Sequence, residues 1–312
     1  METRNLGRSG LNVSLVGLGC NNFGARTTIE DSRAVIHAAL DHGVTLFDTA
    51  DIYGGRGGSE IALGQWLGPR RKDIVLASKF GMAMDDAGRK TGGSRRYIMQ
   101  AVEDSLRRLK TDWIDLYQFH RPDPATPIEE TLRALDDLIT QGKVRYIGCS
   151  NMAGWSVVDA QWTAESRGFS RFISAQDEYS LVFRKAEDGL IPALRAKGMG
   201  LLPYYPLAGG LLSGKYARGA TPTGETRFGK DARSRERYLT DAHWARVEKL
   251  EAFAKARGRS LLELAFSWLA AQDVVGSVIA GATRPEQIAA NVAAVGWKLT
   301  GEDIAEIDRL TA

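Results

Sequence analysis

Residues 114–149, IDLYQFHRPDPATPIEETLRALDDLITQGKVRYIGC, contain one complete strand–helix–strand unit. Two apolar runs, Ile114 to His120 and Val144 to Cys149, have the length and composition of buried strands. Between them, Thr126-Pro127 precedes the segment Ile128 to Gln141, in which apolar residues recur every three or four positions. This pattern predicts a helix that lies with one face against a parallel sheet.

The same alternation of apolar runs and amphipathic segments extends to both sides of this unit. Two further helical segments, Ser32 to His42 and Tyr97 to Leu109, follow the candidate capping residues Thr28 and Ser94. Eight strands with intervening helices favour one closed (β/α)8 TIM barrel over a doubly wound sheet, and no G-x-G-x-x-G turn opens a helix. We therefore expect a single barrel domain over residues 1–312. The candidate strands are Leu15 to Leu18, Thr45 to Asp48, Ile74 to Lys79, Ile114 to His120, Val144 to Cys149, Phe172 to Gln176, Gly200 to Tyr204 and Val275 to Ile279.

Three segments interrupt or adjoin this pattern. Residues 2–14 contain Gly7-Arg-Ser-Gly10 between short runs, which predicts an N-terminal β-hairpin that plugs the bottom of the barrel. Residues 209–240 follow the seventh strand and are too long for an ordinary connection, so they form either a functional lid or a disordered insert. The polar stretch from Asp85 to Ser94 is either part of a lid or an ordinary surface loop.

Composition places the chain among ordinary globular proteins, with 44% hydrophobic and 25% charged residues. The 41 basic and 38 acidic residues are interleaved, which argues against nucleic acid as the main partner. The apolar stretches are far shorter than the ~20 residues of a membrane span, and the first residues lack the apolar core of a secretory signal. We therefore expect no membrane association and a cytoplasmic location. Cys20 and Cys149 form no CxxC motif and are expected to be small core residues.

Four reactive side chains follow three neighbouring predicted strands. Asp48 and Tyr53 come at and after the end of the second strand, Lys79 ends the third and His120 ends the fourth. Because the carboxyl ends of the parallel strands share one face of a barrel, we expect the four groups to meet there.

This set of groups can supply a proton. Tyrosine, with an ordinary pKa of ~10, is a poor acid at neutral pH, and we expect the Lys79 ammonium to lower the pKa of Tyr53. Asp48 would hold Lys79 charged, and His120 would orient a substrate oxygen through a hydrogen bond. Each residue taken singly also has an ordinary structural interpretation. A metal site of Asp48, Asp51 and His120 is the competing arrangement, but a second suitably spaced histidine is lacking, so we expect no metal.

Seven sequence motifs occur in order along nearly the whole chain: Gly17–Gly19 with Asn22–Gly24, Phe47–Gly54, Leu76–Lys79, Ser105–His120, Gly142–Asn151, Tyr205–Tyr216 and Ile279–Asn291. Through them the sequence resembles the aldo-keto reductase superfamily, and it is most similar to the bacterial oxidoreductase and potassium-channel beta-subunit branches. The resemblance implies a catalytic tetrad of Asp48, Tyr53, Lys79 and His120. It also implies a nicotinamide cofactor that is bound across the barrel mouth without a Rossmann domain.

The resemblance further implies which residues hold that cofactor. Ser150, Asn151 and Gln176 would fix the carboxamide, Tyr204 would stack on the nicotinamide ring, and residues from Leu207 onward would cover the cofactor. The implied contacts are Ser150, Asn151, Gln176, Tyr204, Tyr205, Pro206, Leu207, Gly209, Lys215, Arg227, Gly281, Thr283, Arg284, Gln287 and Asn291.

The site for the 2′-phosphate departs from the pattern of many relatives. Gly281 and Gln287 stand where those relatives carry a Lys and an Arg, and Arg284 is the nearest replacement cation. We expect NADP(H) as the cofactor, with NAD(H) as the alternative.

The implied activity is reduction of a small aldehyde or ketone to the alcohol, with NADPH as hydride donor and Tyr53 as general acid. The alternatives are an alcohol dehydrogenase that works in the reverse direction, a nicotinamide-binding regulatory subunit that senses redox state, and a metal-dependent barrel hydrolase. We expect a monomer or a weak homo-oligomer. Residues expected to frame the substrate pocket in some combination are Asn21, Asn22, Phe23, Ile52, Phe80, Trp113 and Tyr205.

Overall fold

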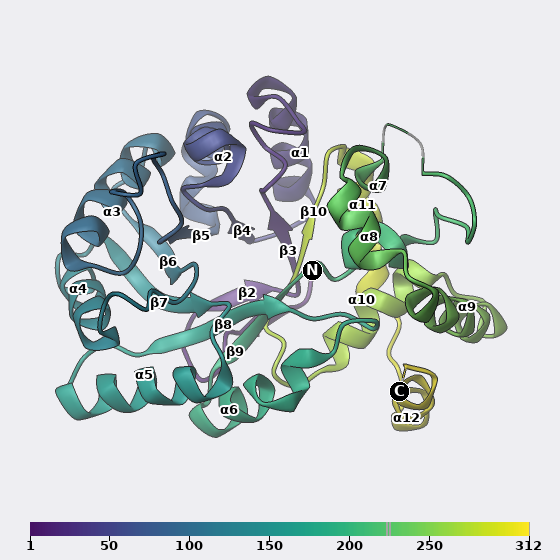
Figure 1. Ribbon diagram of the computed structural model, residues 1–312. Helices are drawn as coiled ribbons and strands as arrows, with labels where there is room; N and C mark the ends of the chain where they lie inside the picture. The colour runs from purple at the N-terminus through teal and green to yellow at the C-terminus, as the bar shows by residue number, and fades with distance from the viewer. Residues whose placement is uncertain (223, 225, 312) are drawn as a thin grey trace.

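The computed structural model describes residues 1–222, 224 and 226–311, and its central feature is a barrel of eight parallel strands surrounded by helices (Figure 1). The strand order is β10-β3-β4-β5-β6-β7-β8-β9, and each neighbouring pair is parallel. Leu201 of β9 accepts a hydrogen bond from Gly276 N at 3.0 Å and donates one to Val274 O at 2.7 Å. These bonds join β9 to the segment that precedes β10, so the predicted (β/α)8 barrel is confirmed.

The strands are β1 (Thr3–Asn5), β2 (Asn12–Ser14), β3 (Val16–Gly19), β4 (Leu46–Asp48), β5 (Val75–Phe80), β6 (Ile114–Phe119), β7 (Val144–Ser150), β8 (Phe172–Glu178), β9 (Gly200–Tyr204) and β10 (Val278–Gly281). The α-helices are α1 (Ile29–Asp41), α2 (Tyr53–Trp66), α3 (Arg95–Leu109), α4 (Ile128–Thr140), α5 (Gly154–Arg167), α6 (Leu190–Lys197), α7 (Arg227–Lys230), α8 (Ala232–Tyr238), α9 (Asp241–Ala256), α10 (Leu261–Ala271), α11 (Pro285–Ala293) and α12 (Gly301–Thr311). Short 3₁₀ segments cover Gly68–Asp73, Lys185–Asp188, Ala208–Ser213 and Ala294–Gly296.

The eighth barrel strand begins later than the sequence predicts. The expected strand was Val275 to Ile279, whereas β10 starts at Val278, and Val275 makes only an isolated bridge to Leu201. At Gly276 the chain lies so close to the hairpin residue Leu6 that an added Cβ would be 2.6 Å from its Cδ1. Contact with the hairpin therefore shapes this stretch, and the regular ladder with β3 begins only beyond it.

Two of the three predicted helix caps are confirmed. Thr28 Oγ1 accepts a hydrogen bond from Asp31 N at 3.0 Å, and Ser94 Oγ accepts one from Tyr97 N at 3.4 Å. The start of α4 differs, because Pro127 occupies the cap position without a side-chain bond. Thr126 instead donates its hydroxyl to Asp123 at 2.7 Å, so it belongs to the preceding turn.

The N-terminal hairpin of β1 and β2 covers the amino-terminal end of the barrel, as predicted. Leu6 and Val13 are fully buried and lie in one apolar cluster with barrel residues such as Leu46 and Leu116. Arg8 N donates to Gly198 O at 2.8 Å, just before β9. The barrel is thus sealed at this end, and its opposite end carries the loops that follow the strands.

The long connection after β9 is folded rather than a structureless insert over its described residues. It contains the 3₁₀ segment Ala208–Ser213 and the helices α7 and α8, which contact that 3₁₀ segment (Figure 1). Phe228 and Tyr238 bury their rings in it. Residues 223 and 225 of the predicted 209–240 segment lie outside the described residues.

The stretch from Asp85 to Ser94 forms a surface turn. Met84 N donates to Lys90 O at 2.9 Å, and Asp85 accepts the backbone N–H of Arg89 at 2.9 Å. No residue of this turn lines the large cavity described below, so within the described chain it behaves as a loop of the α3 side rather than as part of its cover.

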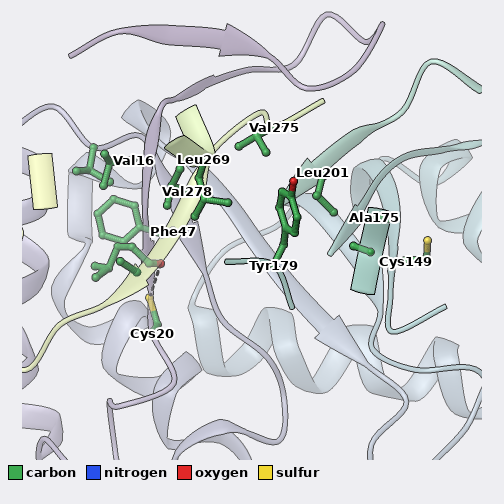
Figure 2. Close-up of a cluster of buried hydrophobic side chains, with 14 of the residues drawn as sticks. Val16, Cys20, Phe47, Cys149, Ala175, Tyr179, Leu201, Leu269, Val275 and Val278 are labelled. Carbon is green, nitrogen blue, oxygen red and sulfur yellow. Dashed lines mark hydrogen bonds between the residues drawn. The ribbon is translucent and has the colours of Figure 1, made fainter. Parts of the chain in front are cut away.

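The main core lies between the barrel and its helices. Figure 2 shows Val16, Phe47 and Val278 from three neighbouring strands together with Leu269 of α10. Cys20 and Cys149 are buried free thiols in this core, which confirms their predicted role as small core residues. No helix in the described part of the chain is long and apolar enough to cross a membrane.

Candidate active site

A buried ion pair forms the floor of the site at the carboxyl ends of β4 and β5. Lys79 Nζ donates to Asp48 Oδ2 at 2.7 Å and to Thr49 O at 2.8 Å. The other carboxylate oxygen, Asp48 Oδ1, accepts from Gln118 Nε2 at 3.1 Å and from Gln176 Nε2 at 2.9 Å. Every charge of the pair is therefore hydrogen-bonded, as burial of charge requires.

Tyr53 lies above this pair because the chain turns sharply after β4. Tyr53 begins α2, and the residues that follow it, Gly54 to Gly57, all have positive φ angles. At Gly54 an added Cβ would be 2.4 Å from Phe23 O, so only glycine fits this turn. The Lys79 Nζ lies 5.0 Å from the centre of the Tyr53 ring, and the His120 ring meets Tyr53 edge-on at 5.7 Å.

The pKa of Tyr53 is raised above its ordinary value of 10.0. Burial of the phenol is the largest cause, and the negative charge of Asp48 adds to it. The Lys79 ammonium lowers the pKa, as the sequence predicts, but burial outweighs it. The expectation of a net lowered pKa is therefore wrong, and Tyr53 holds its proton at neutral pH.

The other two members of the group have well-defined charge states. Burial, the largest single cause, favours neutral Lys79, but the charges and hydrogen bonds of Asp48 and Tyr53 together outweigh it and raise the pKa of the ammonium. His120 has its pKa lowered from 6.5 to about 3 by burial, by Lys79 and by Arg121, so the ring is neutral. His120 Nδ1 is buried without a hydrogen-bond partner among the described residues.

A cavity of about 670 Å³ opens above these residues at the barrel mouth. Asp48, Tyr53 and His120 line it, whereas Lys79 lies beneath it, fully buried. All fifteen residues that the resemblance assigns to a cofactor also line it: Ser150, Asn151, Gln176, Tyr204, Tyr205, Pro206, Leu207, Gly209, Lys215, Arg227, Gly281, Thr283, Arg284, Gln287 and Asn291. Their roles toward a cofactor stay predictions.

Asn151 organises the polar wall beside His120. It adopts a left-handed backbone with φ 56°, and its Nδ2 donates to His120 O at 3.0 Å and to Ser150 Oγ at 2.9 Å. Its Oδ1 accepts from the Tyr204 hydroxyl at 2.9 Å. The amide thus fixes the position of Tyr204 at the cavity, while Gln176 uses its Nε2 on Asp48.

Four cationic side chains line the cavity: Arg26, Lys215, Arg227 and Arg284. The Arg227 guanidinium lies over the Tyr205 ring, 5.3 Å from its centre. Burial and the nearby charge of Arg227 lower the pKa of Arg26, which shows that the two arginines share one region. Arg284 is exposed at the start of α11, and Gln287 accepts the Thr283 N–H at 2.7 Å. This part of the cavity is suited to an anion.

Sequence reasoning missed several lining residues, chiefly Arg26, Ser213 and Leu262. Arg26 lies in the loop between the first barrel strand and α1, so its charge in a loop at the carboxyl end of a strand was an available signal. Ser213 and Leu262 come from the connection after β9 and from α10, and only the folded arrangement brings them to the cavity.

The residues expected to frame a substrate divide into two groups. Asn21, Asn22 and Tyr205 line the cavity. Ile52 is half-buried and does not appear among the described lining residues, and Phe23 and Phe80 are fully buried in the core.

Strand geometry explains two of the differences. Successive side chains of a strand point to opposite faces, so Phe80 points away from the face that holds Lys79. The Phe80 ring instead contacts Tyr117 and Phe119. Trp113 precedes β6 and therefore lies at the far end of the barrel, where Arg71 lies over its ring at 4.6 Å.

The competing metal arrangement is wrong. Asp51 turns its carboxylate away from the cavity toward α3, where Oδ2 accepts from the Tyr97 hydroxyl at 3.3 Å. Asp48, Asp51 and His120 therefore do not converge. In the described part of the chain, no group of three or more His, Cys, Asp or Glu side chains is arranged to hold a metal ion.

The fold and this set of side chains define a barrel enzyme with its site at the carboxyl ends of the strands. The sequence profile of the aldo/keto reductase family matches residues 15–312, and the chain belongs to this family of oxidoreductases. It is 38% identical to an uncharacterized oxidoreductase, YrpG, of Bacillus subtilis (strain 168), over 97% of this chain and 93% of that protein. It is 37% identical to a probable voltage-gated potassium channel subunit beta of Arabidopsis thaliana, over 95% and 91%. It is 34% identical to L-glyceraldehyde 3-phosphate reductase of Escherichia coli (strain K12), over 99% and 92%.

Proposed function

We propose that this enzyme reduces an aldehyde or ketone to the alcohol with NADPH, and that Tyr53 donates the proton. The observation that carries the proposal is the hydrogen-bonded pair of Lys79 and Asp48, buried directly beneath a protonated Tyr53 at the floor of a large cavity. Burial of such a pair is costly unless its geometry is well satisfied. Its position under a tyrosine supports a chemical role rather than a purely structural one.

The residues of the cavity fit a nicotinamide dinucleotide. The volume of about 670 Å³ suits a ligand of that class. Polar groups of Ser150, Asn151 and Gln176 near the floor would hold a carboxamide. Lys215 and Arg227 would hold phosphates, and Arg284 would hold the 2′-phosphate of NADP(H). When bound, the cofactor would supply the hydride.

The chain's own residues would supply the proton and orient the substrate. Tyr53 keeps its proton at neutral pH and would donate it to the carbonyl oxygen as negative charge develops there. The Lys79 ammonium would stabilise the resulting phenolate, and Asp48 would keep Lys79 charged and in place. Neutral His120 would hold the substrate oxygen by a hydrogen bond rather than by proton transfer.

The arrangement of groups is equally able to act in reverse, as an alcohol dehydrogenase. We favour NADP(H) over NAD(H) because Arg284 lines the cavity at the start of α11. The similarity to a relative named as a potassium channel subunit supports a second candidate, a regulatory subunit that binds nicotinamide. A complete tetrad favours the enzyme, and oxidation of NADPH with a panel of small carbonyl compounds would separate the two.

The variant Tyr53→Phe tests the proton donor directly. Turnover should fall by about 10²- to 10⁴-fold, because general acid catalysis is lost. The dissociation constant for NADPH, measured by fluorescence quenching, should stay near that of the parent because the ring remains. Tyr146→Phe, which removes a hydroxyl near Gly10 at the other end of the barrel, is the matched control. Parent-like turnover in Tyr53→Phe would refute the assignment.

A further inference from the structure

A buried carboxylate outside the cavity joins the barrel to the helices that cover it. Glu178 is the last residue of β8 and is only 2% exposed. Both of its oxygens accept hydrogen bonds from consecutive residues of α8. Oε1 accepts from the Tyr238 hydroxyl at 2.5 Å, and Oε2 accepts from Arg237 Nη2. We call residues 227–238, which contain α7 and α8, the covering segment.

The covering segment carries this contact to the cavity. The Tyr238 ring lies edge-on to the ring of Tyr205, at 6.4 Å and 87°. The guanidinium of Arg227 lies over the same Tyr205 ring, 5.3 Å from its centre. Both Tyr205 and Arg227 line the cavity. A shift of α8 away from Glu178 would therefore move two groups that face a bound ligand.

The backbone at Gly209 also lies close to the covering segment. At Gly209, which lines the cavity, an added Cβ would be 2.9 Å from Phe228 Cε1 and 3.1 Å from Tyr238 Cδ2. The rings of the covering segment thus press directly on the loop that follows β9. Glu178 itself is not among the described lining residues and bonds to no member of the tetrad, so its effect on the cavity must pass through Tyr238 and Arg237.

The chemistry of the contact favours the position in which α8 lies against Glu178. A carboxylate that is buried needs partners, and those of Glu178 come from α8. If α8 moves away, both charge-assisted bonds are lost together. Hydrogen bonds to charged groups are of a size that changes an equilibrium or rate constant by about ten- to a hundredfold.

We infer that Glu178 is a positioning residue that holds the covering segment against the barrel and thereby slows release of a dinucleotide from the cavity. The inference rests on the proposed function, because it takes the dinucleotide as the ligand of the cavity. It adds a residue that acts on cofactor retention and not on the proton transfer.

The test is the rate of NADPH release from the purified enzyme, followed by stopped-flow fluorescence after mixing with excess NADP⁺. In Glu178→Gln the release rate should rise by about ten- to a hundredfold, because one charge-assisted contact with Arg237 is lost. Tyr238→Phe is the milder variant and should raise it in the same direction. The increase in release rate in the double variant should be smaller than the product of the two single increases, since both substitutions act on one contact. The single-turnover rate of hydride transfer should stay near that of the parent.

The chain provides a matched control in Glu187. This carboxylate accepts the Tyr179 hydroxyl at 2.6 Å and Arg184 Nε at 2.8 Å, but all three residues lie within the connection between β8 and α6. Glu187→Gln removes the same chemistry without touching the covering segment. It should leave the NADPH release rate unchanged, whatever it does to thermal stability.

The outcomes separate the inference from the proposed function. A parent that binds NADPH, with release unchanged in both Glu178→Gln and Tyr238→Phe, would overturn the role of Glu178 and leave the proposed function standing. Equal acceleration in Glu187→Gln would also overturn it, because a general loss of stability would then explain the effect. A parent that does not bind NADPH would overturn both. A parent that binds NADPH but reduces no carbonyl would overturn the reductase proposal alone, and the release measurement would still test Glu178.

Discussion

Asp51 should make the stability of this enzyme fall as the pH rises through the neutral range. The residue is 1% exposed, Oδ1 has no partner among the described residues, and Oδ2 accepts from the Tyr97 hydroxyl at 3.3 Å. Burial, followed by the charge of Glu60, raises the pKa of Asp51 from 3.8 to about 8, against the opposing effect of Arg108. Burial, and after it the charge of Asp51, raises the pKa of Tyr117. Asp104 of α3 lines the same small pocket as Asp51.

The sign follows from the two pKa values. Between pH 4 and 8 the folded protein keeps a proton on Asp51 that the unfolded chain has already released, so stability declines as the pH rises. The full slope is about 1.4 kcal/mol per pH unit, and it levels off above the folded pKa. Between pH 6 and 8, Asp51 should therefore remove about 2 kcal/mol from the free energy of unfolding.

Urea unfolding at pH 6, 7, 8 and 9 measures this effect in the parent and in Asp51→Asn. The asparagine has a similar shape, can still accept from Tyr97, and does not titrate. The stability of the variant relative to the parent should rise by about 2 kcal/mol from pH 6 to pH 8 and then level off. Asp104→Asn, in the same small pocket, is the control and should give no such trend. A difference that is constant with pH would show that Asp51 ionises normally, and would refute the reasoning.

Two further variants test the charges of the cavity. Lys79→Met leaves the Asp48 carboxylate buried without its cation, so the free energy of unfolding should fall by about 3–5 kcal/mol and NADPH oxidation should nearly cease. Adding Asp48→Asn to this variant should restore most of the stability, measured by urea unfolding, and none of the turnover. A Lys79→Met variant that still oxidises NADPH at the parent rate would show that Lys79 has no part in the mechanism. Arg284→Ala should weaken NADPH binding by about tenfold or more, and less at high salt, while NADH binding stays unchanged. Fluorescence quenching gives both dissociation constants, and an equal loss for the two cofactors would make Arg284 structural.

The parts of the site that sequence predicts well are those set by strand periodicity. Asp48, Lys79 and His120 each stand at or next to the end of a recognisable apolar run, and parallel strands bring such positions to one face. The same rule, applied to the next residue, would have placed Phe80 in the core rather than at a substrate pocket.

The parts that sequence does not predict depend on contacts between distant segments. The late start of β10 depends on Gly276 meeting Leu6, and the raised pKa of Tyr53 depends on how deeply the fold buries its ring. Glu178 gives no local signal either, because its partners Arg237 and Tyr238 lie about 60 positions further along the chain. Burial and tertiary partners become known only with the fold.

The N-terminal hairpin has a consequence for the route by which the chain folds. Arg4 Nη1 bonds to Ala270 O across 266 positions of sequence, Leu6 lies against Gly276, and β3 pairs with β10. These contacts close a loop that spans most of the described chain, and the conformational entropy of that closure must be lost before the contacts form. Helices such as α3 and α4 can form early from local contacts, whereas barrel closure waits for this encounter. The rate of folding should therefore respond more to substitutions at Leu6 or Gly276 than to changes in any single outer helix.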